Sequence, residues 1–370
     1  MATTFCQLIG VDLPIVAFSH CRDVVAAVSR AGGIGVFGAA KFSPEELDIE
    51  LRWIDEKVEG RPYGVDVLAP PPADDGRDSP DLEMLRSRIP EEHMAFMAKL
   101  AERYAVPETL DGGRRREFGG SIVSRRSLEQ QIDVALNHPI KFLVSGLGPF
   151  APNVVQRAHS QNVVIGGMCG RVTHAERHVN CGADVVIAQG AEAGGHCGEI
   201  GTLVLTPQVV DAVAPVPVLA AGGISTGRQL AAVLALGAQG AWIGSAWLTT
   251  EESDVDPIVI TKLLEAVSNE TVRTRCVTGK PARLLKTGLE EAWEEPGAPS
   301  PLPPPLQGLL VLPLIRRAFR NRIVPLMGQA VGQAVGMMKS RRTCKATVDE
   351  MMVELVDSLE RVRTELDLAE

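Results

Sequence analysis

The chain has 370 residues, of which 45% are hydrophobic and 22% are charged, and its formal net charge is −9 at pH 7. This length leaves room for a large core, and the acidic balance disfavours nucleic acid or an anionic membrane as the main partner. Gly, Pro or Arg interrupts the longest apolar stretches, so no membrane span is expected. The first residues lack a signal-peptide pattern and the seven cysteines form no CxxC motif, which predicts reduced thiols and a cytoplasmic location.

Eight short apolar segments are typical of strands that are buried on both faces. In chain order they are residues 15–19, 34–38, 63–68, 142–146, 163–167, 185–189, 216–221 and 241–244. Most are separated by roughly 15 to 30 residues with helical patterning, as in βα units. We therefore predict an α/β fold, a closed (β/α)8 TIM-type barrel, with an open doubly wound sheet as the alternative. The strand count and the lack of GxGxxG after the first strand favour the barrel.

Three segments carry capping-box signals that predict helix starts. They begin at Ser43, which is followed by Pro44 and Glu46, at Thr226 and at Thr347. The last predicts an amphipathic C-terminal helix over 347–370, which packs on the barrel or on a partner subunit, so that a homodimer is considered. Its apolar stripe consists of Val348, Met351, Met352, Leu355, Val356, Leu359 and Val362.

Two segments interrupt the alternation of strands and helices, so the barrel is assigned to residues 1–69 and 127–255. Residues 70–126 start with three prolines and become helical over 91–104, and we interpret them as an insertion over the barrel mouth. Residues 256–346 form a helical and irregular substrate region that contains the proline-rich stretch 300–305. Within it, the basic and apolar stretch 309–322 is interpreted as an ordinary surface helix.

Two neighbouring strands end in residues that expose backbone N–H groups. Gly222-Gly223 follows one strand and Gly244-Ser245 follows the next. Glycine lets the backbone approach an anion closely, and two such turns on consecutive strands match the usual phosphate site of a (β/α)8 barrel. The alternative is that these glycines only serve tight turns. We favour a phosphate cradle.

A histidine lies in the glycine-rich loop that precedes this cradle. His196 stands in the run Gly194-Gly195-His196-Cys197-Gly198, and an imidazole there can exchange a proton near neutral pH. Gln189 ends the preceding strand, where its amide suits the pyrimidine edge of a flavin or bonds to neighbouring backbone. Cys197 has no adjacent basic residue, so packing is favoured over a nucleophilic role.

The remaining histidines have weaker context. His20 and Cys21 follow the first strand and either reach the same mouth or cap the next helix. His174 and His178 are four residues apart on a predicted helix, but no third ligand is near, so solvated helix positions are expected and no metal site is predicted.

The chain resembles the nitronate monooxygenase family, formerly called 2-nitropropane dioxygenases, and shares its barrel with the flavin-dependent enoyl-ACP reductases. The resemblance rests on Ala27–Gly35, on Gly182-Ala183-Asp184 through Gly198, on Pro217–Ile224 and on Leu236-Gly237-Ala238 through Ser245. A later segment, Met327–Gly332, is similar to the family's Gly-Gln segment. Asp66 stands where the family usually has Asn.

The resemblance implies FMN in the barrel and His196 as the catalytic histidine facing the substrate. The implied cofactor-binding residues are Ala17, Phe18, Asp66, Gln189, Gly194, Gly195, Gly222, Gly223, Gly244, Ser245 and Gln329. The implied activity is the oxidation of an alkyl nitronate by O₂ to a carbonyl compound and nitrite. Two alternatives stay open: an NAD(P)H-dependent flavin reductase that acts on quinones or enoyl thioesters, and a non-redox barrel that binds a phosphate ligand.

Overall fold

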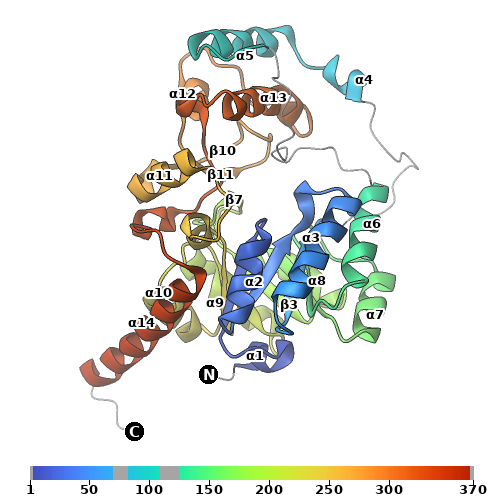
Figure 1. The fold of residues 1–370 in the computed structure, drawn as a ribbon, viewed down its shortest axis with the longest axis vertical. Helices are drawn as coiled ribbons and strands as arrows, with labels where there is room; N and C mark the ends of the chain where they lie inside the picture. Colours follow the sequence, from blue (N-terminus) through green and yellow to red (C-terminus); the bar gives the residue numbers. More distant parts are fainter. Residues whose placement is uncertain (1–2, 70–81, 109–124, 367–370) are drawn as a thin grey trace.

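The computed structural model describes residues 3–69, 82–108 and 125–366. Eight parallel strands close into a barrel in the order β1-β2-β3-β4-β5-β6-β8-β9, and β9 pairs back with β1 (Figure 1). The predicted (β/α)8 fold is confirmed, and each strand lies within two residues of its predicted bounds. The strands are β1 (Ile15–Ser19), β2 (Ile34–Gly38), β3 (Tyr63–Val67), β4 (Phe142–Ser145), β5 (Val164–Cys169), β6 (Val185–Gln189), β8 (Val218–Ala221) and β9 (Gly240–Ile243).

Helices cover the outside of the barrel. Ser43 accepts a hydrogen bond from the Glu46 backbone at the start of α3, and Thr226 does the same for Gln229 at the start of α10, so both capping boxes are confirmed. These helices are α2 (Arg22–Arg30), α3 (Pro44–Lys57), α6 (Arg125–Leu136), α7 (Pro152–Ser160), α8 (Val172–Asn180), α9 (Thr202–Val213) and α10 (Gly227–Ala235).

The strands alternate between an inner and an outer face, as pleated strands must. On β1, Val16 belongs to the cluster inside the barrel, whereas Ala17 belongs to the cluster between the strands and the helices. A short helix, α1 (Thr4–Ile9), contributes Phe5 and Ile9 to the inner cluster and so closes the bottom of the barrel. The open end is therefore the opposite rim, where the strands end.

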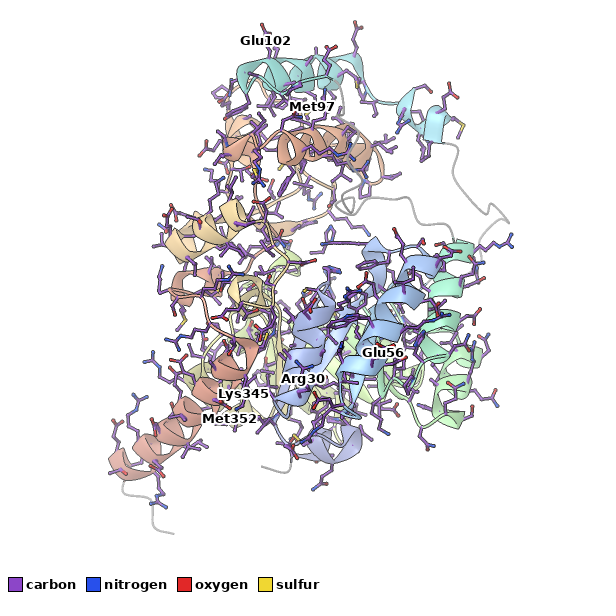
Figure 2. All side chains as sticks on the ribbon, in the orientation of Figure 1. Arg30, Glu56, Met97, Glu102, Lys345 and Met352 are labelled. Atoms are coloured by element: carbon purple, nitrogen blue, oxygen red, sulfur yellow. The ribbon has the colours of Figure 1, made fainter. Side chains whose placement is uncertain are left out.

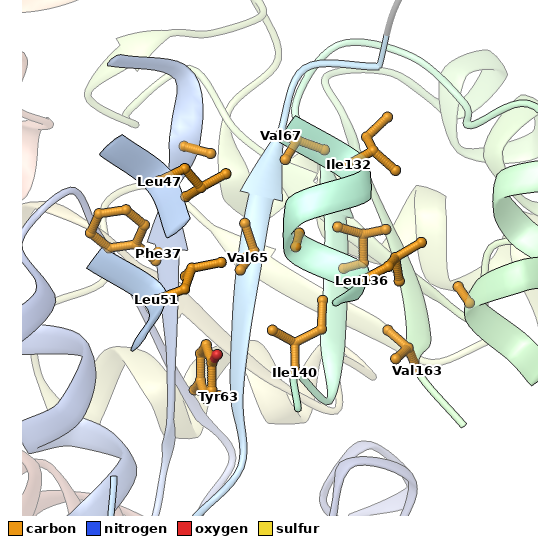
Figure 3. Packing of buried hydrophobic residues seen from close by; sticks show 14 of the residues in the cluster. Phe37, Leu47, Leu51, Tyr63, Val65, Val67, Ile132, Leu136, Ile140 and Val163 are labelled. Atoms are coloured by element: carbon orange, nitrogen blue, oxygen red, sulfur yellow. The ribbon is translucent and has the colours of Figure 1, made fainter. Parts of the chain in front are cut away.

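A large part of the core lies between strands and helices. Figure 3 shows Leu47 and Leu51 of α3 packed toward Val65 of β3, with Ile132 and Leu136 of α6 beside them. Each of these side chains is at most 3% exposed. Burying a side chain of this size contributes about 1.5–3 kcal/mol, so this layer fixes the strand ends that carry the site.

A second layer lies above the barrel mouth (Figure 1). The sheet β10-β11-β7 connects the two layers, and the helices α5 and α13 pack on each other through Met97, Leu100 and Leu310. Figure 2 shows Met97 on the side of α5 that faces α13, and Glu102 on the outer side. The elements are α4 (Leu82–Arg86), α5 (Glu91–Arg103), α11 (Pro257–Glu265), α12 (Gly288–Glu294), α13 (Leu306–Arg320), β7 (Gly195–His196), β10 (Thr271–Thr274) and β11 (Ala282–Leu285).

This layer corrects one expectation. The stretch 309–322 is not an ordinary surface helix, because Val311 and Leu314 of α13 are at most 2% exposed and lie in the core shared with α5. The helix predicted over 91–104 is confirmed as α5. Most of the remaining insertion, including the prolines at 70–72 and the turn at 74–76, lies outside the described residues.

Short 3-10 turns link these elements, namely η1 (Ala39–Lys41), η2 (Ser245–Thr249), η3 (Ser268–Glu270), η4 (Val324–Leu326) and η5 (Gln333–Met337). The C-terminal helix α14 (Cys344–Glu365) begins earlier than predicted. Thr343 is its N-cap, because its side chain accepts from the Ala346 backbone, whereas Thr347 lies inside the helix and donates to the Thr343 carbonyl. In the described part of the chain, no helix has both the length and the apolar character needed to cross a membrane.

Candidate active site

A cavity of about 1220 Å³ opens at the carboxyl ends of the barrel strands, between the barrel and the second layer. Ligand pockets in proteins usually measure about 300–1,000 Å³, so this one has room for a cofactor and a second molecule. All but one of the predicted site residues line it, namely Phe18, Asp66, Gln189, Gly194, Gly195, His196, Gly222, Gly223, Gly244, Ser245 and Gln329.

Ala17 is the exception. Its side chain is fully buried and packs in the cluster between β1 and the outer helices, together with Cys21 and Val24. Because successive residues of a strand point to opposite faces, Phe18 faces the cavity and Ala17 does not. The implied contact between Ala17 and a cofactor is therefore not supported for its side chain.

The two bare turns lie side by side. Ala221 pairs with Trp242 across β8 and β9, so Gly222-Gly223 and Gly244-Ser245 leave neighbouring strands at the same rim. Gly222 and Gly223 have φ values of +99° and +73°, which side chains rarely tolerate. A Cβ added to Gly244 would approach only the Phe18 ring, at 3.8 Å. Three of the four turn residues therefore carry no side chain at the cavity rim, so a ligand could approach their backbone closely, as an anion site requires.

The cradle is braced by residues that the sequence analysis did not single out. The Glu192 carboxylate accepts hydrogen bonds from the backbone N–H and the hydroxyl of Thr202, at 2.8 and 2.9 Å. The Thr202 hydroxyl also lies 2.9 Å from the Gly222 carbonyl. Below the second turn, Ser245 Oγ accepts from the Gly332 backbone at 2.9 Å. These contacts join residues 10 to 87 positions apart, so no local pattern could have revealed them.

His196 is held at the edge of the cavity by the small sheet. Gly195 and His196 form β7, which pairs with Arg283 and Ala282 of β11. Nε2 of His196 lies 2.8 Å from the hydroxyl oxygen of Thr278. No bond to Nδ1 is found among the described residues, which leaves that nitrogen for a ligand in the cavity. Although His196 is exposed at the cavity edge, the surrounding wall partly desolvates its ring and lowers the pKa of His196, and the positive charge of Lys280 lowers it further.

His20 was left between two roles, and the structure assigns it to the cavity. Its Nδ1 lies 2.7 Å from the Gly38 carbonyl, and its ring packs edge-on against Phe18 with centroids 5.2 Å apart. Burial lowers the pKa of His20 to about 3, with a further contribution from Lys41, so the ring is neutral. The helix α2 instead begins after Cys21, whose side chain makes no capping bond.

Asp66 is the penultimate residue of β3, lines the cavity and is only 6% exposed. Burial without a neighbouring cation raises the pKa of Asp66 to about 8, so the carboxyl is mostly protonated at neutral pH. A protonated carboxyl can donate one hydrogen bond and accept another. It could therefore serve a ligand as both donor and acceptor, as the amide of an Asn side chain would.

The outer wall of the cavity carries basic side chains that the sequence analysis missed. Arg316 and Arg320 are four residues apart on α13, and both line the cavity with Phe319 between them. Arg322 follows and lies 3.4 Å from the carboxylate of Asp256, which caps α11. The i, i+4 spacing of the two arginines was visible in the sequence, but their direction depended on how α13 packs.

Other candidates do not contribute chemistry. Burial raises the pKa of Cys197, whose thiol donates to the Ala191 carbonyl, so packing is the better description of this residue. His178 is not solvated as expected: it is 4% exposed and its Nε2 lies 3.0 Å from the Met168 carbonyl. Among the described residues, no group of three or more His, Cys, Asp or Glu side chains could hold a metal ion.

Comparisons with known proteins identify relatives of this chain. The family model of nitronate monooxygenase matches residues 11–354. Rv1533 of Mycobacterium tuberculosis, provisionally named a monooxygenase, is 47% identical over 368 residues, which cover 97% of this chain and 98% of that protein. A protein of Staphylococcus saprophyticus, provisionally named a nitronate monooxygenase, is 31% identical over 301 residues, which cover 76% of this chain and 78% of that protein.

Solved structures show the same fold. The nitroalkane oxidase from Streptomyces ansochromogenes has a TM-score of 0.80 and 28% identity, covering 97% of this chain and all of that chain. FabK from Thermotoga maritima has a TM-score of 0.75 and covers 99% of both chains, but at 24% identity it supports the fold alone.

The closed parallel barrel with its cavity at the strand ends, together with these matches, defines an oxidoreductase of the (β/α)8-barrel class. The chain belongs to the nitronate monooxygenase family.

Proposed function

We propose that this protein is an FMN-dependent enzyme that oxidises alkyl nitronates with O₂ to carbonyl compounds and nitrite. One observation carries the proposal: the double glycine turn and His196 line the same cavity at the open end of the barrel. Family membership supports an oxidative flavoenzyme. The proposal adds that the flavin is FMN, that the substrate is an alkyl nitronate and that the oxidant is O₂.

The residues present fit FMN. The turns at Gly222-Gly223 and Gly244-Ser245 would hold its phosphate, because their glycines line the cavity and let an anion approach the backbone, whereas a side chain at Gly223 would intrude beside Glu192. Gln189 and Asp66 line the same cavity and would hydrogen-bond the polar edge of the ring, with the neutral Asp66 carboxyl as a donor. Bound FMN would supply the electron acceptor that the side chains of this chain lack.

His196 would hydrogen-bond the nitronate, or form it by taking the carbon proton of a neutral nitroalkane. Thr278 occupies Nε2, so Nδ1 is the ring nitrogen that would contact the substrate. Since the pKa of His196 is lowered, the ring is neutral at pH 7 and would accept a proton from the carbon acid or hydrogen-bond the nitronate oxygens. The β7–β11 pairing fixes the ring, so this geometry exists before the substrate arrives.

The test uses purified protein reconstituted with FMN. Under air it should release nitrite from propionate-3-nitronate or ethylnitronate, and His196→Asn should retain FMN while losing nitrite release. An FMN-loaded sample that releases no nitrite from any alkyl nitronate would refute the nitronate assignment. A colourless protein that does not take up FMN would refute the cofactor assignment as well.

A second candidate, an NAD(P)H-dependent flavin reductase, is favoured by one observation. The cavity is larger than a small nitronate and a cofactor need, and Arg316 and Arg320 line its outer wall, where they would hold phosphates of a dinucleotide. Rapid anaerobic bleaching of the bound flavin by NADH or NADPH would select this function. Bleaching of the flavin by the nitronate but by neither NADH nor NADPH would instead support the oxidation of alkyl nitronates.

A further inference from the structure

His20 presents one bare ring nitrogen to the cavity at the open end of the barrel. It directly follows β1, lines the cavity and is half-buried. Its Nδ1 lies 2.7 Å from the Gly38 carbonyl, whereas Nε2 has no hydrogen-bond partner among residues 3–69, 82–108 and 125–366. Nε2 is not sealed inside the protein either, since it is absent from the buried polar atoms of these residues that lack a partner. Nothing in the proposed reaction uses this nitrogen.

The protonation state of the ring makes Nε2 an acceptor. A carbonyl oxygen can only accept, so Nδ1 must carry the hydrogen of the bond to Gly38. Burial lowers the pKa of His20 to about 3, with a further contribution from the charge of Lys41, so the ring carries no second proton. A neutral imidazole with its hydrogen on Nδ1 has a lone pair on Nε2. This nitrogen can therefore accept a hydrogen bond from a ligand but cannot donate one.

Three contacts hold the ring in this orientation. The Ser19 hydroxyl accepts a hydrogen bond from the Cys21 backbone at 3.0 Å, which closes a turn around His20. The ring packs edge-on against Phe18, with centroids 5.2 Å apart. Gly38 leaves the room that the ring needs, because a Cβ there would lie 2.5 Å from Nδ1. The acceptor is therefore fixed before a ligand arrives, which lowers the entropic cost of binding.

The surroundings of the ring indicate which donor suits it. Lys41 lines the same cavity and its charge reaches the ring, while the charge of Asp254 acts on Lys41. Because a cation and an anion stand together here, a neutral donor is favoured over an ionic one. Phe18 and Trp242, whose stacked rings are 5.6 Å apart, make the neighbouring wall apolar. An aliphatic chain that carries a hydroxyl fits this wall, since the chain packs on the rings and the hydroxyl donates to Nε2.

We propose that Nε2 of His20 is a hydroxyl-binding site, which accepts a hydrogen bond from an O–H group of a molecule in the cavity. Under the proposed function, on which this assignment rests, that molecule is either an alkyl nitronate that carries a hydroxyl or the ribityl chain of FMN. In the first case His20 sets the substrate preference. In the second case it contributes to the affinity for the cofactor.

The first experiment compares the nitronates of 3-nitro-1-propanol and 1-nitrobutane, which differ by a hydroxyl in place of a methyl group. The FMN-loaded wild type should have a kcat/KM about two- to tenfold higher for the hydroxylated nitronate, the range of one hydrogen bond between neutral groups. His20→Phe keeps a ring beside Phe18 but lacks the acceptor, so it should lose this preference. His174→Phe is the control: His174 is exposed on α8, and the preference should not change.

Two further variants separate ligand binding from a structural role. Asn at position 20 can place its amide where Nδ1 lies and keep the bond to Gly38, whereas the longer Gln can place its carbonyl oxygen near Nε2. His20→Gln should therefore retain part of the preference, and His20→Asn should lose it. A residue that served only to bind Gly38 would give the reverse order. Flavin content and thermal unfolding show that the variants fold.

A fluorescence titration of the cofactor-free protein with FMN distinguishes the two sources of the hydroxyl. Loss of the substrate preference in His20→Phe at unchanged FMN affinity assigns the hydroxyl to the substrate. FMN binding that is about two- to tenfold weaker in His20→Phe, without a substrate preference in the wild type, assigns the hydroxyl to the cofactor.

The proposal is overturned if His20→Phe changes neither the preference nor the FMN affinity, or if His20→Asn retains more of the affected property than His20→Gln. A protein that oxidises neither nitronate would refute the proposed function but still permit this test. The change in the spectrum of the bound flavin on anaerobic titration with each nitro compound would then give the two affinities.

Discussion

His196 is tied to Thr278, which precedes β11, by a 2.8 Å contact between Nε2 and the hydroxyl oxygen. The two residues are 82 positions apart, and the β7–β11 pairing brings them together beside the cavity. This contact decides which ring nitrogen is left for the substrate. It also gives the catalytic proposal a positioning residue that can be tested separately from the histidine.

Replacing His196 by Asn should leave FMN content unchanged and lower nitrite release from a neutral nitroalkane, whose carbon proton must first be removed, by about two to four orders of magnitude, as expected for loss of a general base. Thr278→Val should cause a smaller loss, because the imidazole remains but is less well oriented. Nitrite release and the visible flavin spectrum measure the two effects. Cys197→Ser is the control and should stay active. Full activity in His196→Asn would show that this residue has no catalytic role.

In the dependence of kcat/KM on pH, the loss of activity toward acid should occur at a pH below the ordinary pKa range of histidine. Because partial desolvation at the cavity wall and the charge of Lys280 lower the pKa of His196, the ring stays neutral, and able to accept a proton, to a more acidic pH than a free imidazole. Lys280→Gln removes a charge that opposes protonation, so it should move this loss of activity toward higher pH. The measurement is nitrite release against pH with saturating FMN. A loss of activity that moved toward lower pH would contradict this account of the pKa.

Gly223→Asp should expel the cofactor. The left-handed backbone at φ +73° disfavours any side chain, and a carboxylate would stand beside Glu192 and the proposed phosphate position. The absorbance ratio of flavin to protein measures the loss. The control is Gly148→Asp, in another strand-end loop, where an added Cβ meets nothing within 4 Å. Equal flavin content in both variants would show that the cradle is misplaced.

Asp66→Asn should stabilise the cofactor-free protein at alkaline pH. The folded-state pKa of Asp66 is raised to about 8, so the stability of its protonated form is fully present below the unfolded-state pKa and is lost as pH rises through 8. Asn cannot ionise, so the variant keeps this stability. The wild-type free energy of unfolding, by contrast, falls by about 1.4 kcal/mol or less for each pH unit between the two pKa values. Denaturant unfolding at pH 4 and pH 8.5 provides the comparison. If the free energies of unfolding of the variant and the wild type differ by the same amount at both pH values, the raised pKa of Asp66 is ruled out.

Gly227→Ala should destabilise the fold by about 1–3 kcal/mol, as overpacking does. The added methyl group would collide with the Met351 carbonyl and the Leu355 backbone, where α10 and α14 cross. Thermal unfolding of the protein at one fixed concentration measures the change. Gly148→Ala is the matched control, since that site has open space. A Gly227→Ala protein as stable as this control would mean that the crossing is looser than described.

The barrel could be predicted because its signals are local. Apolar runs at regular intervals, and the capping boxes at Ser43 and Thr226, mark strands and helices within a few residues of sequence. The box at Thr347 misled for a related reason: Thr343 offers a competing cap four residues earlier, and packing of Cys344 and Val348 in the core selects the longer helix.

The sequence by itself determined the strand order, the glycine turns and the loop that holds His196, because a parallel barrel brings all strand ends to one rim. Only the tertiary structure decided that Ala17 points away from the cavity, that α13 turns its arginines into it, and that Asp66 is neutral. Those properties depend on burial and on contacts between residues far apart in the chain, and neither is encoded in any short window of sequence.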